Sequence, residues 1–173
     1  MKSNFDFLNR YWPALAQIGA TAENYVYSDP NACVYKLGMF AERLVQEILV
    51  FEHIAEPVND NTHANRIRIL KRAGLLPHEI DNTLYILRKT RNSAVHAGTD
   101  SVDEAKTLLS LTYNLAVWFM ETYGDWGYIA LEFVMPVEIT HEGLESVIAE
   151  QEKKIVELTK QLAVVKTAAS GKT

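Results

Sequence analysis

The chain has 173 residues, of which 48% are hydrophobic and 23% are charged, a composition typical of a globular protein that can bury a core without disulfides. Its formal net charge of −5 excludes a globally basic surface, so any nucleic acid must bind at a local patch. The single cysteine, Cys33, excludes an internal disulfide and a multi-cysteine metal site.

We expect Cys33 to be a small core residue of a protein in a reducing compartment. Residues 1–9 lack the charged start and the apolar run of a signal peptide. No uninterrupted apolar stretch reaches the roughly 18 residues that a membrane-spanning helix needs. We therefore expect a cytoplasmic protein with no membrane partner.

Apolar residues at helical spacing predict a bundle of about five helices in residues 1–125. Residues 4–27 are predicted to form a helical hairpin or a bent helix, with Pro13 near the start, where a helix tolerates proline. Ser28-Asp29-Pro30 predicts a turn and a helix start. The helix that follows, to about Ile54, has the widest apolar face in the chain.

Three further helices are predicted in this bundle. The first spans residues 63–73 and ends at Gly74. The second begins at Pro77, reaches about residue 97 and stops at Gly98. The third reaches Tyr123, and a capping box of Ser101 and Glu104 marks its beginning.

The remaining residues change character. Residues 126–140 are apolar and contain Pro136, which favours an extended strap packed on the bundle, with room for one short strand. In residues 141–173 the apolar positions follow heptad spacing, which predicts the start of a coiled coil; the alternative is a single surface helix folded back on the bundle. Because natural proteins rarely end partway through a heptad run, we expect the chain to be part of a longer protein. The heptad positions are occupied by Leu144, Ile148, Ile155, Leu158, Leu162 and Val165, with Gln151 in the place of the missing apolar residue.

A polar motif ends the predicted helix before Gly98, namely Arg91-Asn92-Ser93-Ala94-Val95-His96. Arg88, Asn92 and His96 are four residues apart and share one face, whereas Arg91 is offset from His96 by roughly 140° and must curl towards it. Arginine binds phosphate oxygens, and histidine transfers protons near neutral pH. One histidine per chain does not easily serve as both acid and base in RNA cleavage, but two chains would supply two.

This motif resembles the ribonuclease motif of the HEPN (higher eukaryote and prokaryote nucleotide-binding) superfamily. The flanking sequence is similar to the HEPN-like domain at the front of type I restriction R-subunit and related helicase proteins. That similarity covers roughly residues 4–135 and is carried by Asn4-Phe5-Asp6-Phe7-Leu8, Tyr27-Ser28-Asp29-Pro30, Lys36-Leu37, Ala41-Glu42, Ala73-Gly74-Leu75-Leu76-Pro77, Trp118-Phe119 and Thr122-Tyr123-Gly124.

The resemblance implies a HEPN-like bundle that forms a homodimer and cleaves RNA without a metal or another cofactor. Arg91, Asn92 and His96 would be the catalytic residues, with Arg88 in support. Glu42 lies on the long helix, where related folds place an acidic partner for the motif arginine. The alternatives are a solvated helix end at the motif and an ordinary solvated glutamate at Glu42.

Two further groups of residues complete the sequence-based interpretation. Four basic residues on the short helix could follow a nucleic-acid backbone, although such a group is more often a solvated face. These residues are Arg66, Arg68, Lys71 and Arg72. The histidines outside the motif lack the spacing of metal ligands, so no metal site is predicted. The alternative to a nuclease is a non-catalytic module that dimerises or docks restriction-system subunits.

Overall fold

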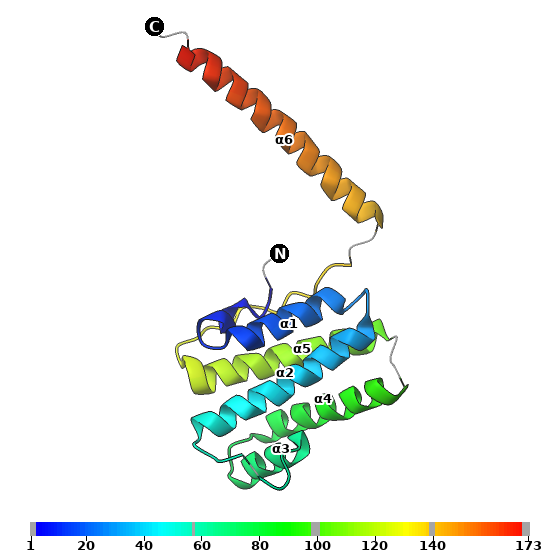
Figure 1. Cartoon of the computed structure of the whole chain (residues 1–173), viewed down its shortest axis with the longest axis vertical. Coiled ribbons are helices and arrows are strands. Elements are labelled where there is room, and N and C mark those ends of the chain that lie inside the picture. Colours follow the sequence, from blue (N-terminus) through cyan, green and yellow to red (C-terminus); the bar gives the residue numbers. More distant parts are fainter. Residues whose placement is uncertain (1–2, 57, 98–100, 139–140, 171–173) are drawn as a thin grey trace. The chain divides into compact units, whose positions relative to one another are not determined.

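The computed structural model describes residues 3–56, 58–97, 101–138 and 141–170, and all side chains in them except those of residues 95–97, 141–144, 146–147 and 163–170. Within these ranges the fold is all-α, as the sequence predicts, and no strand is present. Residues 1–136 and residues 137–173 form two compact units. The elements, shown in Figure 1, are η1 (Asp6–Arg10), α1 (Pro13–Tyr25), α2 (Pro30–Phe51), α3 (His63–Arg72), α4 (His78–Ala97), α5 (Val102–Phe119), η2 (Met120–Gly124) and α6 (His141–Ser170).

Helix α2 is the central helix of the first unit, because it packs against α1, α3, α4 and α5 (Figure 1). Pro30 occupies its first turn, and the Asp29 carboxylate caps it by accepting a hydrogen bond from the Ala32 backbone N–H at 2.9 Å. Cys33 is fully buried in this helix, as predicted. Burial raises the pKa of its thiol to about 12, so the thiol is protonated and unreactive at neutral pH.

The ends of the other bundle helices follow local sequence signals. Thr62 caps α3, and Gly74 ends that helix with a positive φ of 73°, a conformation that glycine adopts without strain. Ser101 accepts a hydrogen bond from the Glu104 N–H at 3.1 Å, which confirms the predicted cap of α5. The predicted stop at Gly98 lies outside the described residues.

Two helix boundaries differ from the prediction. The first helical region consists of a short 3₁₀ helix, η1, followed by α1, because Pro13 starts a new helix rather than continuing the first. The α-helix expected to reach Tyr123 ends at Phe119 and continues as the π-helical turn η2. At its last residue, Gly124, an added Cβ would lie 2.6 Å from Met120 Sδ and 3.1 Å from the Trp12 ring, so the Met120 side chain would have to move.

Residues 128–136 of the predicted strap are extended and lie on helices of the first unit. Side chains from three distant positions, of which only Tyr113 lies in a helix, hold its backbone. Asn4 exchanges two hydrogen bonds with Val134 at 2.8 and 2.9 Å, Tyr113 Oη donates to the Leu131 carbonyl at 2.6 Å, and Tyr27 Oη donates to that of Pro136 at 2.7 Å. The short strand considered for this region is absent from its described residues. The neighbouring helices use their backbone N–H and C=O groups internally, so the strap can bond only to side chains and has no strand with which to pair.

Helix α6 forms most of the second unit. Its apolar heptad side chains are exposed within that unit: Ile148 is 49%, Ile155 61%, Leu158 52% and Leu162 59% exposed. The side chains of Leu144 and Val165 lie outside the described residues. No helix in the described part of the chain has both the length and the apolar character needed to span a membrane.

Candidate functional site

Arg91 lies on the inward face of α4. Leu84 and Leu87 are almost fully buried, and Ala94 is 4% exposed. These residues and Arg91 repeat at spacings of three and four, so they form one stripe directed at α2. Asn92 is exposed on the outer surface of the same helix. Arg91 and Asn92 therefore face different surroundings, although they are adjacent in the motif.

The other motif residues occupy the same end of α4. Arg88 is half-buried, and its guanidinium carbon lies 5.7 Å from the centre of the Tyr85 ring. The backbone of His96 is in the last turn of α4, where the helix dipole favours a positive charge. The His96 side chain lies outside the described residues, so its orientation towards Arg91 stays a prediction.

Gly38 creates the space that Arg91 occupies against α2. A Cβ atom at this position would lie 2.5 Å from Arg91 Cδ, which is closer than atoms of this kind approach one another. Above this contact, the Arg91 guanidinium lies over the Tyr35 ring, with its carbon 5.1 Å from the ring centre. Glycine in the middle of the longest bundle helix is therefore explained by the packing of one arginine.

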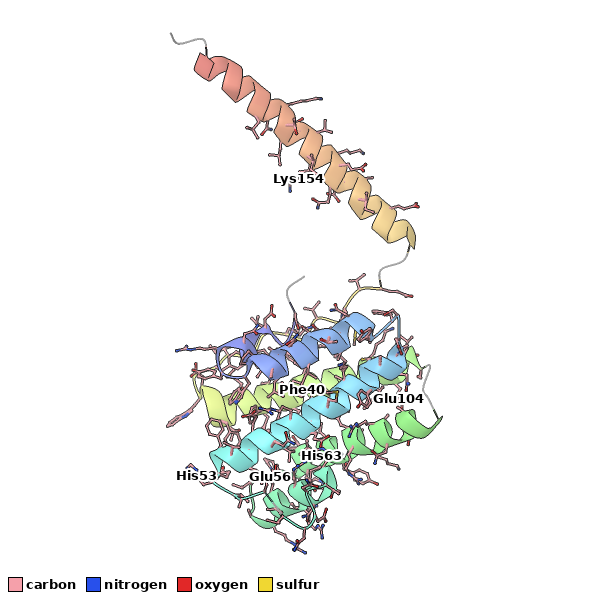
Figure 2. The ribbon with its side chains drawn as sticks, viewed as in Figure 1. Phe40, His53, Glu56, His63, Glu104 and Lys154 are labelled. Atoms are coloured by element: carbon pink, nitrogen blue, oxygen red, sulfur yellow. The ribbon has the colours of Figure 1, made fainter. Side chains whose placement is uncertain are left out.

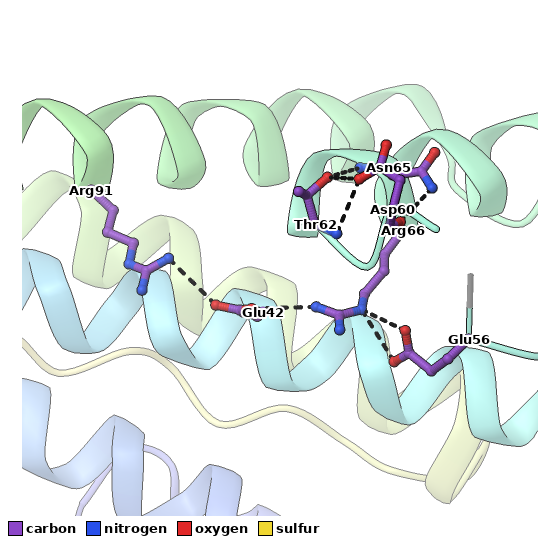
Figure 3. A network of polar contacts seen from close by, with 7 residues as sticks. All are labelled: Glu42, Glu56, Asp60, Thr62, Asn65, Arg66 and Arg91. Atoms are coloured by element: carbon purple, nitrogen blue, oxygen red, sulfur yellow. Dashed lines mark hydrogen bonds and ion pairs between the residues drawn. The ribbon is translucent and has the colours of Figure 1, made fainter. Parts of the chain in front are cut away.

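Glu42 connects Arg91 to a second arginine. Its Oε2 accepts a hydrogen bond from Arg91 Nη1 at 3.4 Å, and its Oε1 accepts one from Arg66 Nη1 at 3.3 Å. Arg66 Nε also donates to both oxygens of Glu56, at 2.9 and 3.1 Å. Figure 3 shows Glu42 between the two guanidinium groups, with Glu56 beyond Arg66. The acidic partner expected on the long helix is thus present and bridges α3 and α4.

The four basic residues of α3 do not share one surface. The Arg66 side chain is only 9% exposed and is engaged by two carboxylates, so it is not available to a nucleic-acid backbone in this state. Arg68, Lys71 and Arg72 are exposed. Arg68 pairs with Asp60 at 3.4 Å and Lys71 with Asp81, which reduces the positive charge of this surface. The predicted basic strip is therefore reduced to three residues.

His63 lies beside the arginines, and the sequence did not single it out for this site. It is 9% exposed, and neither ring nitrogen has a hydrogen-bond partner among the described residues. Burial, and to a lesser extent the nearby charges of Arg91, Arg66 and Arg88, lower its pKa to about 4. His63, labelled in Figure 2, is therefore uncharged at neutral pH.

A pocket of about 310 Å³ opens where the end of α4 meets the end of α1 and the start of α2. Ala94, which belongs to the motif, lines this pocket. The other lining residues include Tyr25, Asp29, Asn31, Tyr35 and Lys36. The side-chain oxygen of Asn31 is buried and has no hydrogen-bond partner among the described residues. The pocket thus combines aromatic, acidic, amide and basic groups next to Arg91.

The sequence contained weak signals for the features that it did not identify. Glycine within a helix costs about 1 kcal/mol relative to alanine, so a glycine at position 38 indicated that another part of the chain approaches the backbone of this helix closely. His63 is in register with the buried residues Ile67 and Leu70, which indicated a core position rather than a surface one. Among the described residues no group of histidine, cysteine or acidic side chains has the geometry to hold a metal ion.

Comparison with known proteins places these observations in a family. Over 136 residues, 78% of its length, the chain is 30% identical to the type I restriction enzyme EcoKI endonuclease subunit of Escherichia coli (strain K12). The chain spans only 11% of that protein. No solved structure matches the chain. The model of the domain of unknown function DUF4145 matches residues 20–161, which covers most of the bundle and the strap. The chain therefore belongs to the DUF4145 family.

Proposed function

We propose that the chain is the HEPN-like N-terminal domain of a type I restriction R-subunit-like protein and acts as an RNA endonuclease of a restriction or antiviral defence system. Its similarity to a restriction endonuclease subunit supports a role in a restriction or antiviral defence system. The motif from Arg91 to His96 supports RNA cleavage as the reaction. The partners would be a second copy of the chain, RNA, and the nuclease or helicase modules of the restriction system.

The observation that carries this proposal is the position of the motif beside an open pocket. A solvated helix end would expose its polar side chains to water and would have no need of an anchored arginine. Here Arg91 is held by Glu42 and Tyr35, and Ala94 lines the pocket. A preorganised guanidinium next to a ligand-sized space is what stabilisation of a phosphorane requires.

Each motif residue has a distinct role in this mechanism. Arg91 would bind the phosphate, since its guanidinium carries five N–H donors and Glu42 occupies only part of them. Asn92 would orient the phosphate, and Arg88 would add positive charge. His96 would transfer protons, and the imidazoles of two chains would share the roles of base and acid.

Replacing His96 with alanine is expected to lower the rate of RNA cleavage by at least about 10²-fold, the usual contribution of a general acid or base. The assay compares labelled single-stranded and structured RNA. Because His78 is exposed at the start of the same helix, His78→Ala is the matched control and should cleave like the wild type. Equal cleavage by wild type and His96→Ala, or cleavage by neither, contradicts the proposed activity.

Cleavage is also expected to survive EDTA. The described residues contain no cluster of ligands for a metal, and a single carboxylate such as Glu42 does not hold Mg²⁺ by itself. The assay is the same, with and without the chelator. Loss of activity in EDTA that added Mg²⁺ restores would contradict the metal-free mechanism.

A second candidate function, a dimerisation or docking module, is favoured by the exposed apolar stripe of α6. A row of large apolar side chains in water favours association with another helix. Leu158→Asp combined with Leu162→Asp should therefore weaken self-association, because each buried leucine contributes on the order of 2 kcal/mol. Sedimentation velocity measures the change.

A control for this variant changes exposed positions of α6 outside the stripe. Lys153→Gln with Lys160→Gln changes the net charge by the same amount, at heptad positions that face away from the stripe, and should leave the association constant close to that of the wild type. An unchanged dimer in the leucine variant would show that α6 does not drive pairing. The association would then have to come from the bundle.

A further inference from the structure

The pocket beside the motif has two aromatic walls. Tyr25 comes from the last turn of α1 and is 38% exposed, and Tyr35 comes from α2 and is 41% exposed. Arg91 contacts the Tyr35 ring and fixes it in place. Flat rings that are held at the surface, rather than packed in the core, are the usual platforms for unpaired bases of nucleic acids.

The polar groups of the pocket are those that an amino-bearing ring would need. The Asp29 carboxylate uses Oδ1 to cap α2, which leaves its second oxygen as an acceptor. The Asn31 side-chain oxygen is buried without a partner among the described residues, and rotation of the amide would offer it to a donor. Both groups accept hydrogen bonds from N–H donors.

The charged residues of the pocket favour a base in one part of it and a phosphate in another. Asp29 disfavours an anion directly at the start of α2, despite the helix dipole there. Lys36, about two turns further along α2, also lines the pocket and offers a positive charge to a backbone phosphate. The volume of about 310 Å³ corresponds to roughly ten water molecules, which is ample for one heterocycle.

We propose that this pocket receives one unpaired nucleobase beside the phosphate bound at Arg91, and that it prefers bases with an exocyclic amino group over uracil. The inference rests on the proposed function, because it takes the phosphate at Arg91 from that mechanism. It adds a specificity site: the base is held between Tyr25 and Tyr35, its amino group donates to Asp29 and Asn31, and Lys36 contacts the adjoining phosphate.

The test measures binding rather than cleavage, using the full chain with His96→Ala in buffer of low ionic strength. Fluorescence anisotropy is recorded with short labelled oligo(A), oligo(C) and oligo(U). Oligo(A) and oligo(C) should bind several-fold more tightly than oligo(U). Tyr25→Leu should weaken oligo(A) binding about tenfold, the usual loss when one stacking aromatic is removed.

Two variants make the test specific. Tyr11→Leu is the matched control, since Tyr11 is also an exposed tyrosine of the bundle (41%) but does not line the pocket, and it should bind like the parent. Asp29→Asn preserves a good cap for α2 while removing the charge, so it should reduce the preference for oligo(A) over oligo(U) without unfolding the helix.

The outcomes separate this inference from the proposed nuclease activity. Absence of oligonucleotide binding, equal binding by Tyr25→Leu and its parent, or equal weakening by Tyr11→Leu overturns the base pocket, even if the wild type cleaves RNA through His96. Binding that depends on Tyr25 and prefers oligo(A) supports the pocket, even if the wild type cleaves nothing. In that case only the nuclease activity fails.

Discussion

Replacing Glu42 with alanine is expected to lower the free energy of unfolding by about 2 kcal/mol. Glu42 accepts hydrogen bonds from Arg91 and Arg66, so its loss leaves two neighbouring cations without their shared carboxylate. Removing one member of a fully buried ion pair costs about 3–5 kcal/mol. The cost is smaller here because the side chains of Glu42 and Arg91 are 31% and 25% exposed and water partly replaces the lost contact.

Urea unfolding followed by circular dichroism measures this change. Glu47→Ala is the matched control, because Glu47 lies on the same helix and pairs with the exposed Arg43 at 2.7 Å. Such a surface pair contributes about 0.3–0.5 kcal/mol. Equal destabilisation by the two alanine variants would show that Glu42 does not hold the arginines together.

Acidification from pH 6.5 to pH 4 is expected to destabilise the fold by about 3 kcal/mol through His63 alone. Its pKa falls from the ordinary value of 6.5 to about 4 in the folded chain. A difference of this size corresponds to about 1.4 kcal/mol for each pKa unit. The causes are burial first and then the charges of Arg91, Arg66 and Arg88, which oppose a further positive charge.

The direction follows from proton binding in the two states. Between pH 6.5 and 4 the unfolded chain protonates this imidazole and the folded chain does not, so each step towards acid favours unfolding. Above pH 6.5 both states are neutral, and His63 contributes no pH dependence. Below about pH 4 both states are protonated, and its contribution becomes constant.

His63→Gln isolates this effect from the contributions of all other titratable groups. The variant should show a shallower fall in unfolding free energy between pH 6.5 and 4, whatever its stability at neutral pH. His78→Gln changes an exposed histidine and should keep the slope of the wild type. A slope in His63→Gln that matches the wild type would rule out His63 as the source.

The sequence was sufficient for the helices and for several of their boundaries, because these depend on neighbouring residues. The helix start at Ser28-Asp29-Pro30, the stop at Gly74 and the cap at Ser101 were all predicted and are all present. The two boundaries that differ, at Pro13 and Phe119, lie where packing against other elements alters a continuous helical pattern.

The candidate site was predicted only in part. The motif around Arg91 was found from residue spacing, and Glu42 was proposed as its partner from the family resemblance. Arg66 was placed on a basic surface because a pattern on one helix cannot show which residues a second helix will cover. Its contacts with Glu42 and Glu56 bring together three segments that are well separated in the chain.

The sequence by itself thus determined an all-α chain with a polar motif at the end of one helix, since helical period and capping act over a few residues. Only the tertiary structure decided that Arg91 lies against Gly38, that His63 is buried beside three arginines, and that Tyr25 and Tyr35 line one pocket. These features depend on which faces of α1, α2, α3 and α4 meet. Packing of whole helices fixes that choice, and no local pattern encodes it.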